Sequence, residues 1–389
     1  MFELWGANNP AVRRGALLIA LVVALVVQCG TTATARAASS GIVDVPLEFL
    51  VQNTDTSQDP CPSDGKQYVV RGHLTGPREA IAGTAPRAAT VYYEGFDTGE
   101  WMWRFRLVPG YDYAAQMAEL GYASVTVDQV GYGASGHPQG NDTCVGAQAD
   151  IAHQIIGQLR SGTYSAQGMS PVRFKTVVLG AHDVGGAAAE VEAYSYNDID
   201  GLMVFTYQDQ GYTPFVLGIA ADAGARCAAG GEPAYPGGPG GYVYYAHLSD
   251  WPTLMPNSGP DVIAGAIASR LRNPCGLIPS TATTAALNYT GATTRSMGLG
   301  EIHVPVLLVL GALDPVFTHD GFDQQARYFT GSHDVTAVLM PGTGHFETLD
   351  RNAPRFRALV ADWLGTRGMV SAGVCPQQST NSSASSASS

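Results

Sequence analysis

The chain has 389 residues and a formal net charge of −12, with 45% hydrophobic but only 14% charged residues. This balance excludes a largely disordered chain, because such chains combine few apolar residues with many charges. The acidic charge argues against partners such as nucleic acid and anionic membrane surfaces, which attract clusters of Lys and Arg. The length allows one large domain with an insertion, or two domains of ordinary size.

The first segment is predicted to be an export signal. An arginine pair at 13–14 precedes an unbroken apolar run at 16–27, and Ala-Arg-Ala follows at 35–37. As a helix this run spans about 18 Å, well short of the roughly 30 Å hydrocarbon layer of a membrane. We therefore predict a secretory signal peptide over residues 1–37, a secreted protein and no membrane association after cleavage. The alternative is an uncleaved membrane anchor.

Strand-like and helix-like segments then alternate along the chain. Short apolar runs bounded by turn residues predict eight strands, at residues 45–51, 68–74, 90–93, 123–127, 176–179, 202–206, 304–310 and 335–339. Helical spacing of apolar residues predicts helices at 111–120, 148–159 and 354–364, and a Gly/Ala-rich helix directly follows the fifth strand. This alternation predicts an α/β fold, with a mostly parallel sheet and helices on both of its faces.

The alternation stops between residues 207 and 302. That stretch contains a Pro/Gly run at 236–241 and several tyrosines, but few strand signals. A long irregular segment inside a compact α/β domain is normally functional, so we expect a cap inserted between two strands of the sheet. The predicted domains are a core at 38–207 and 302–370, the cap at 208–301, and a disordered Ser-rich tail at 371–389.

The fifth predicted strand runs directly into Gly-Ala-His-Asp-Val-Gly-Gly at residues 180–186. A sharp strand–turn–helix with small residues around one reactive side chain is a nucleophile elbow. The sequence here resembles the G-x-S-x-G elbow of the α/β-hydrolase superfamily, with Asp183 at the serine position. A D-x-x-G-x-G-x-S loop at 128–135 and Gly-Thr-Gly-His-Phe at 342–346 also resemble that superfamily. The resemblance covers residues 42–367 and implies an α/β-hydrolase fold.

The same resemblance implies a catalytic triad of Asp183, Asp314 and His345, in the order that this fold uses. His345 can deprotonate water only if a carboxylate holds its other ring nitrogen, and Asp314 is the natural partner. The structural alternatives are that Asp314 caps the turn after its strand and that His345 is a packed loop histidine. Backbone N–H groups of Val184 and Phe96 would supply the oxyanion hole.

An aspartate at the elbow resembles the epoxide hydrolases and haloalkane dehalogenases of the superfamily. A carboxylate attacks carbon by displacement and forms an ester, which water activated by His345 then hydrolyses. An epoxide also needs an acid for its leaving oxygen, and epoxide hydrolases take it from cap tyrosines. Any single one of these tyrosines is more often an ordinary packing residue. The candidates are Tyr212, the one we single out as a possible accessory residue, and Tyr235, Tyr242, Tyr244, Tyr245 and Tyr289.

Two departures from those families leave other functions open. Val184 follows Asp183, where dehalogenases use tryptophan, and Glu-Gly-Phe-Asp at 94–97 stands where epoxide hydrolases show H-G-x-P. Glu94, a second possible accessory residue, would repel an anionic intermediate unless it is protonated or turned away. The favoured function is a secreted hydrolase of a small or medium apolar molecule, with epoxide-hydrolase-like chemistry. The alternatives are a non-hydrolytic binding protein, a cyclase or isomerase using Glu94 and His345, and an esterase or lactonase.

Five of the six cysteines follow the predicted signal peptide, and an exported protein meets oxidising surroundings. In the implied fold, the turn that carries Cys61 lies at the same sheet edge as Cys144, while Cys227 and Cys275 both fall in the cap. We therefore expect Cys61–Cys144 and Cys227–Cys275 disulfides, with Cys375 left over. No Cys-x-x-Cys or Cys/His cluster indicates a metal, and no cofactor is expected. The expected partner is a small-molecule substrate.

Overall fold

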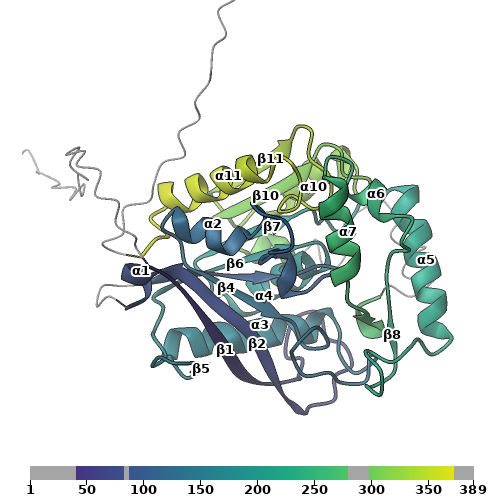
Figure 1. Cartoon of the computed structure of the whole chain (residues 1–389), viewed down its shortest axis with the longest axis horizontal. Helices are drawn as coiled ribbons and strands as arrows, with labels where there is room; N and C mark the ends of the chain where they lie inside the picture. The colour runs from purple at the N-terminus through teal and green to yellow at the C-terminus, as the bar shows by residue number, and fades with distance from the viewer. Residues whose placement is uncertain (1–40, 83–86, 279–297, 372–389) are drawn as a thin grey trace, which may run out of the picture. The chain divides into compact units, whose positions relative to one another are not determined.

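The computed structural model describes residues 41–82, 87–278 and 298–371. Within these residues the centre of the fold is a nine-stranded sheet with the strand order β11-β10-β7-β6-β3-β4-β2-β1-β5 (Figure 1). All eight predicted strands are present, and the ninth, β5 (Ser165–Ala166), is a two-residue strand at the edge. The eight are β1 (Ile42–Gln52), β2 (Gln67–Pro77), β3 (Ala88–Tyr93), β4 (Ser124–Asp128), β6 (Thr176–His182), β7 (Gly201–Phe205), β10 (Val306–Gly311) and β11 (Val335–Met340).

The burial pattern of each strand follows from its place in the sheet. Strands β3, β4, β6, β7, β10 and β11 pair in parallel, whereas β1 pairs antiparallel with β2, and β2 with β4. Strands β3, β7 and β10 are buried at every residue, as expected for parallel strands covered on both faces. Residues of β1 alternate between exposed and buried, because one face of this hairpin meets solvent. The mostly parallel α/β fold is thereby confirmed.

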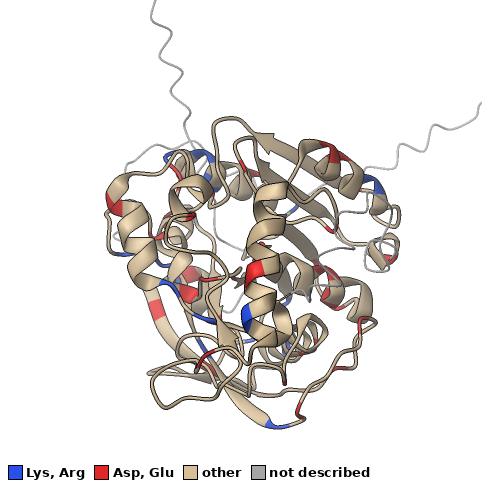
Figure 2. Cartoon of the chain, turned by 90° about the vertical axis from the view of Figure 1, so that its right-hand side faces the viewer, with Lys and Arg blue, Asp and Glu red and all other residues tan. Residues whose placement is uncertain are grey.

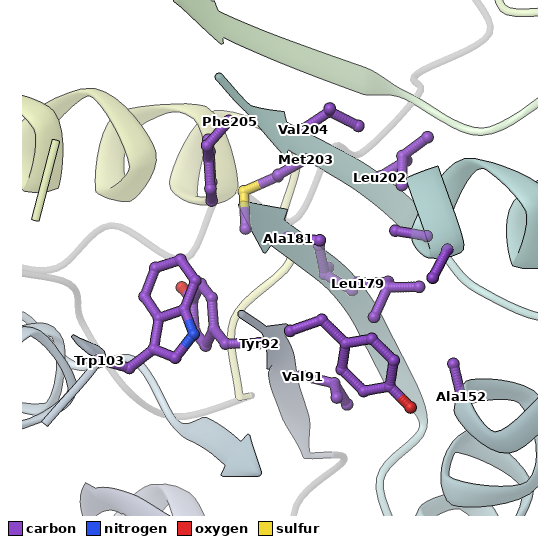
Figure 3. Close-up of a cluster of buried hydrophobic side chains, with 14 of the residues drawn as sticks. Val91, Tyr92, Trp103, Ala152, Leu179, Ala181, Leu202, Met203, Val204 and Phe205 are labelled. Carbon is purple, nitrogen blue, oxygen red and sulfur yellow. The ribbon is translucent and has the colours of Figure 1, made fainter. Parts of the chain in front are cut away.

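Two layers of helices cover the sheet. Helices α2 (Tyr113–Glu119) and α11 (Ala353–Thr366) pack together on one face, and α3 (Val145–Ser161) and α4 (Val184–Tyr196) pack together on the other (Figure 1). Apolar side chains of three adjacent strands fill the core between these layers. Figure 3 shows part of this core: Val91, Tyr92, Leu179, Ala181, Leu202, Met203, Val204 and Phe205, with Trp103 and Ala152 at its edges.

The segment between β7 and β10, hereafter the β7–β10 segment, is more regular than the sequence suggested. It contains α5 (Pro214–Ala228), α6 (Trp251–Leu254), α7 (Pro260–Ser269) and the small pair β8 (Tyr242–Val243) and β9 (Asn273–Pro274). The expectation of little regular structure is therefore wrong. Both longer helices begin with proline in the first turn, and the side chain of Thr213 caps α5 by accepting from the Val216 N–H.

The remaining helices are short or lie near the ends of the described chain. They are α1 (Arg78–Ala82) and α10 (His319–Tyr328), with 3₁₀ turns η1 (Glu100–Met102), η2 (Cys275–Leu277) and η3 (Leu299–Glu301). No helix among the described residues is both long enough and apolar enough to cross a membrane. Figure 2 shows Lys and Arg scattered rather than gathered on the face in view, as the small number of charges suggests.

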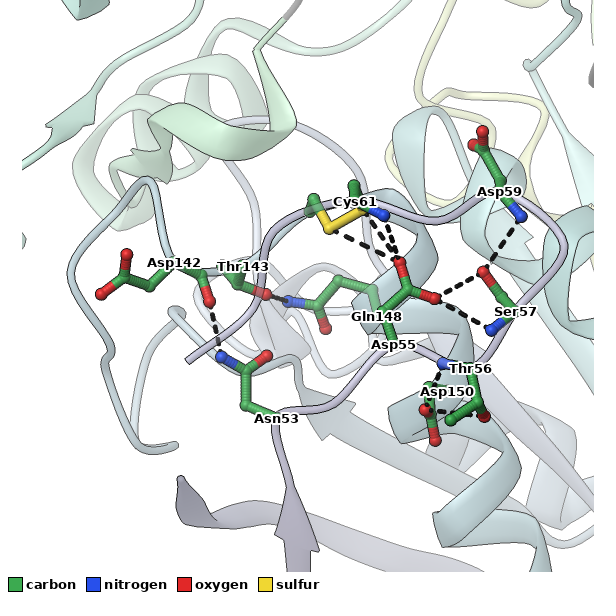
Figure 4. The surroundings of a disulfide bond; sticks show 11 residues. Asn53, Asp55, Thr56, Ser57, Asp59, Cys61, Asp142, Thr143, Gln148 and Asp150 are labelled. Carbon is green, nitrogen blue, oxygen red and sulfur yellow. Dashed lines mark hydrogen bonds between the residues drawn. A yellow bond between two sulfur atoms is a disulfide. The ribbon is translucent and has the colours of Figure 1, made fainter. Parts of the chain in front are cut away.

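Two disulfides join the cysteines that the sequence analysis paired. Cys61 bonds to Cys144 and Cys227 to Cys275, with Cα–Cα distances of 6.3 Å and 5.5 Å. Asp55 orders the first of them, since its carboxylate accepts the Cys61 N–H at 2.8 Å (Figure 4). The predicted signal peptide, the Ser-rich tail, Cys375 and Tyr289 lie outside the described residues.

Candidate active site

Asp183 occupies a strained turn between β6 and α4. Its backbone has φ 50° and ψ −129°, a conformation that costs free energy in a residue other than glycine. The first turn of α4 has no room for a side chain at residue 185, because a Cβ on Gly185 would lie 2.3 Å from the Glu94 carbonyl oxygen. The absence of side chains there lets α4 pack directly on β3. The helix N-terminus consequently points at Asp183, where it favours a negative charge.

The carboxylate of Asp183 lies where an oxyanion would form. Its Oδ2 accepts the Phe96 N–H at 2.9 Å, and the Val184 N–H also bonds to the carboxylate. The loop after β3 can approach this closely because residue 95 is glycine; a Cβ there would lie 2.5 Å from the Asp183 Cβ. The two N–H groups predicted for the oxyanion hole therefore both contact the elbow side chain.

His345 and Asp314 complete the group. Asp314 follows β10 and His345 follows β11, so the parallel strands deliver both to the edge where β6 ends. His345 Nδ1 lies 3.0 Å from Asp314 Oδ2, and Nε2 lies 3.9 Å from Asp183 Oδ1. The other oxygen of Asp314 accepts the Val316 N–H at 2.6 Å. Asp314 thus caps its turn and also orients His345, so the two interpretations are compatible.

Burial and neighbouring charges shift the pKa values of Asp183 and His345 in opposite directions. Burial raises the pKa of Asp183 above its ordinary value, although His345 and the N–H groups of Phe96 and Val184 oppose this. Burial lowers the pKa of His345, but the neighbouring Asp314 carboxylate and the Asp183 charge outweigh it and leave that pKa raised. The site is therefore arranged to hold a proton on His345 between two carboxylates.

Two cavities meet at Asp183. The larger has a volume of about 290 Å³ and the smaller about 30 Å³. Asp183 lines both, whereas His345 lines only the smaller, whose volume suffices for about one or two water molecules. Aromatic side chains dominate the larger cavity: Phe96, Tyr207, Tyr212, Tyr245 and Phe317.

Of the candidate tyrosines within the described residues, two line the larger cavity and three have other surroundings. Tyr212 and Tyr245 line the larger cavity together with Asp183. The Tyr242 hydroxyl instead donates to the Pro138 carbonyl at 2.8 Å. Arg270 and Arg272 stack on the Tyr244 ring, and Tyr235 is 49% exposed.

Glu94 lines neither cavity. Its Oε1 accepts the Gln129 N–H at 2.7 Å. Burial, together with the charge of Asp128, raises the pKa of Glu94 well above its ordinary value, which favours the uncharged carboxyl. This weakens the repulsion that the sequence suggested, and an accessory role for Glu94 at Asp183 has no support in this geometry.

Asp97 is a residue of the site that the sequence analysis did not single out. It is buried, has φ 59° and lines the smaller cavity. Its carboxylate accepts the N–H groups of Tyr245 and Ala246 at 2.6 and 2.7 Å and the Asn273 amide at 2.7 Å. Burial raises the pKa of Asp97 to about 6. The only signal in the sequence is an acid directly after the oxyanion residue; its partners lie about 150 residues away.

The fold and the site together define a hydrolase of the α/β type. The family model described as "Alpha/beta hydrolase family" matches residues 95–359. This match covers more than half of the sequence, and the chain belongs to that family. No curated protein matches the sequence.

Solved structures show the same fold at low sequence identity. A thermophilic esterase from Thermogutta terrifontis is 18% identical with a TM-score of 0.52, over 83% of this chain and 99% of that chain. A monoacylglycerol lipase from Paleococcus ferrophilus is 19% identical with a TM-score of 0.52, over 73% and 96%. An enol-lactonase from Burkholderia xenovorans LB400 is 15% identical with a TM-score of 0.51, over 77% and 97%. At these identities the similarity concerns the fold.

Proposed function

We propose that the protein is an exported hydrolase that opens epoxides of small or medium apolar molecules through an ester on Asp183. The carboxylate at the elbow carries this proposal. Its Oδ2 is held by the Phe96 N–H, while its Oδ1 lies 3.9 Å from His345 Nε2. The sequence signal for export and the two disulfides support the exported location.

In the first step Oδ1 of Asp183 attacks a carbon of the epoxide ring. A carbon–oxygen bond to Asp183 forms, the ring carbon–oxygen bond breaks, and the leaving oxygen takes a proton. Tyr245 and Tyr212 line the same cavity as Asp183 and are the candidate proton donors. Burial, together with the Asp183 charge, raises the pKa of Tyr245 well above its ordinary value, so its hydroxyl is protonated but is a weaker acid than an exposed tyrosine.

In the second step His345 removes a proton from water in the smaller cavity, and the hydroxide attacks the Asp183 carboxyl carbon. Negative charge then develops on Oδ2, which already accepts the Phe96 N–H. The ester bond breaks on the carboxyl side, the leaving oxygen takes the proton held by His345, and a diol leaves with the original Oδ1. The regenerated carboxylate retains the oxygen that came from water.

This oxygen transfer gives the decisive experiment. A single turnover in H₂¹⁸O, with enzyme in excess over an aryl or alkyl epoxide, should place ¹⁸O in the peptide containing Asp183 and none in the first diol. Direct attack of water on the epoxide would instead put ¹⁸O in the first diol. That result, or no turnover across a panel of epoxides, would overturn the proposal.

Ester or lactone hydrolysis is the second candidate, because the similar structures include an esterase, a lipase and an enol-lactonase. The elbow holds no serine, so His345 would have to activate water for direct attack on the carbonyl. First-turnover acid product would then carry ¹⁸O, which distinguishes the two. The cyclase or isomerase alternative lacks its second proton-transfer group, since Glu94 lines neither cavity.

A further inference from the structure

A second cluster of chemistry-bearing side chains lies away from the proposed active site. It consists of His153, Glu192 and Asp198, hereafter the His153 cluster. One potential ligand atom from each residue lies within 4.8 Å of the other two. His153 Nδ1 is 2.7 Å from Asp198 Oδ2. None of the three lines either active-site cavity.

The fold brings together residues that are up to 45 positions apart in the chain. His153 lies on α3 and Glu192 on α4, and these helices pack against each other. Asn197 ends α4 with φ 54°, a left-handed conformation that turns the chain and leaves Asp198 beside α3. The His153 ring stacks on Tyr196, with ring centres 4.2 Å apart, which fixes the plane of the imidazole.

The cluster holds two carboxyl groups beside one imidazole, and Arg160 acts on the two carboxyl groups through its charge. Glu192 is completely buried, its carboxyl faces that of Asp198, and no other hydrogen-bond partner among the described residues reaches either of its oxygens. Oδ1 of Asp198 is also buried, and in the described part of the chain it has no hydrogen-bond donor from outside the cluster. Arg160, the nearby cation, donates instead to the Asp198 carbonyl and, at 2.7 Å, to Asp200.

Two facing carboxyl groups in a buried place need a proton or a cation between them. Burial, with the facing Asp198 carboxyl, raises the pKa of Glu192 well above its ordinary value, which is how a shared proton would act. The imidazole nitrogen of His153 lies beside the two carboxyl groups and would be a third ligand for a metal ion. A proton shared by the two carboxyl groups needs no such third ligand. The side chains of His153 and Asp198 are 41% and 25% exposed, so an ion can reach the cluster from solvent.

We propose that the His153 cluster binds one divalent transition-metal ion, with Zn²⁺ as the best match. One imidazole nitrogen and two carboxylate oxygens are ligand atoms that Zn²⁺ accepts, at roughly 2.0–2.2 Å. A solvent molecule would complete the coordination at the exposed side. The ion joins α3 to the end of α4 and neutralises the buried carboxyl groups, so its role is structural.

Sequence patterns alone could not indicate this site. No Cys-x-x-Cys or Cys/His spacing marks the three residues, which is why the sequence analysis expected no metal. The proposal is independent of the reaction at Asp183, because none of the three residues contacts the elbow cavities.

The test is metal binding by tag-free protein that has been treated with a chelator and then dialysed. We expect calorimetry with Zn²⁺ to give one ion per chain and thermal unfolding to shift upward with Zn²⁺. Titration with Co²⁺ should give a visible absorption band of a nitrogen- and oxygen-ligated ion. His153→Ala and Glu192→Gln should each weaken the affinity by about tenfold or more, the loss typical of damaged metal sites.

A matched control is available on the surface of the β7–β10 segment. His247 Nε2 lies 3.0 Å from Asp222, and both side chains are well exposed, without a buried third carboxyl. His247→Ala should therefore leave the stoichiometry and affinity unchanged. Loss of the ion in His247→Ala would overturn the proposal.

Two further results would also overturn it. One is the absence of saturable Zn²⁺ or Co²⁺ binding by the wild-type protein, which would leave a shared proton between Glu192 and Asp198. The other is wild-type affinity in Glu192→Gln. If Glu192→Gln fails to fold, His153→Ala remains informative, because the His153 side chain is partly exposed and its removal leaves the buried pair intact.

Discussion

The two oxygens of the Asp183 carboxylate have different surroundings. Oδ2 accepts the Phe96 N–H at 2.9 Å, whereas Oδ1 lies 3.9 Å from His345 Nε2. In the proposed mechanism Oδ1 attacks the substrate, and Oδ2 carries the charge when the ester is later hydrolysed. One side chain thus contributes both the nucleophile and the acyl group of the second step.

Replacing that nucleophile should abolish turnover. We expect Asp183→Asn to reduce kcat by about a thousandfold or more, because an amide oxygen is a far poorer nucleophile than a carboxylate. Asp183→Ser should not yield an efficient epoxide hydrolase either, since an ether formed on serine cannot be hydrolysed. Steady-state assays with circular dichroism as a folding control test this. Full activity in Asp183→Asn would contradict the covalent mechanism.

Removing the base should separate the two steps. In His345→Gln the carboxylate can still attack, but no group activates water, so we expect an ester on Asp183 to accumulate. Intact-protein mass spectrometry after rapid quenching should show one added substrate mass per chain. An inactive His345→Gln protein without any adduct under single-turnover conditions would argue that His345 acts before the ester forms.

The pH dependence should differ between the steps. Ester formation needs ionised Asp183, whose pKa is raised above 3.8, and ester hydrolysis needs neutral His345, whose pKa is raised above 6.5. Lowering the pH should therefore protonate His345 first and slow hydrolysis while attack continues. The fraction of enzyme present as ester should rise as the pH falls from above the His345 pKa, and quenched-flow mass spectrometry measures it. An adduct fraction independent of pH would contradict these assignments.

At the scale of elements, local signals located most of the sheet and the catalytic group. Apolar strands followed by Asp183, Asp314 and His345 carry their own turn residues, so a short stretch of sequence identifies each. The direction of a side chain depends on distant contacts instead. Glu94 turns to the backbone of Gln129, 35 residues later, and no local pattern indicates this. Helix α5 was missed although its buried residues Val216, Ile219, Ala220 and Ala223 follow helical spacing.

The close contact between α4 and β3 is a second element-scale feature that can be tested. A Cβ on Gly185 would lie 2.3 Å from the Glu94 carbonyl oxygen, so Gly185→Ala must push α4 away from β3. We expect a loss of about 1–3 kcal/mol in the free energy of unfolding and reduced activity, because the elbow moves with the helix. Urea denaturation measures the first effect.

The control for this substitution is Gly157→Ala in α3. Nothing lies within 4 Å of a Cβ at Gly157, and alanine favours the helix by roughly 0.5–1 kcal/mol. The two alanine variants should therefore change stability in opposite directions. Equal stability of Gly185→Ala and wild-type protein would show that α4 can shift without cost.

At the scale of the whole molecule, each disulfide joins segments that are distant in sequence. Cys227 ends α5 and Cys275 begins η2, a separation of 48 residues within the β7–β10 segment. The double substitution Cys227→Ala/Cys275→Ala should reduce the free energy of unfolding by up to about 4 kcal/mol, mainly because the unfolded chain gains freedom. Denaturation curves test the loss, with Cys375→Ala, which the sequence predicts to be unpaired, as the unchanged control. A free Cys227 in non-reduced peptide mapping would contradict this pairing.

The order of the strands has a consequence for biosynthesis. Strands β1 to β7 come from residues 42–205 and are neighbours in the sheet, whereas β10 and β11 join beside β7 only after another hundred residues have been made. Until then β7, whose residues are all buried in the finished protein, is an unpaired apolar edge strand of the nascent chain and is prone to aggregate. Asp314 and His345 both follow the late strands. In the proposed mechanism a half-made chain therefore carries the elbow without its base and cannot turn over substrate, but it depends on prompt completion or on chaperones to stay soluble.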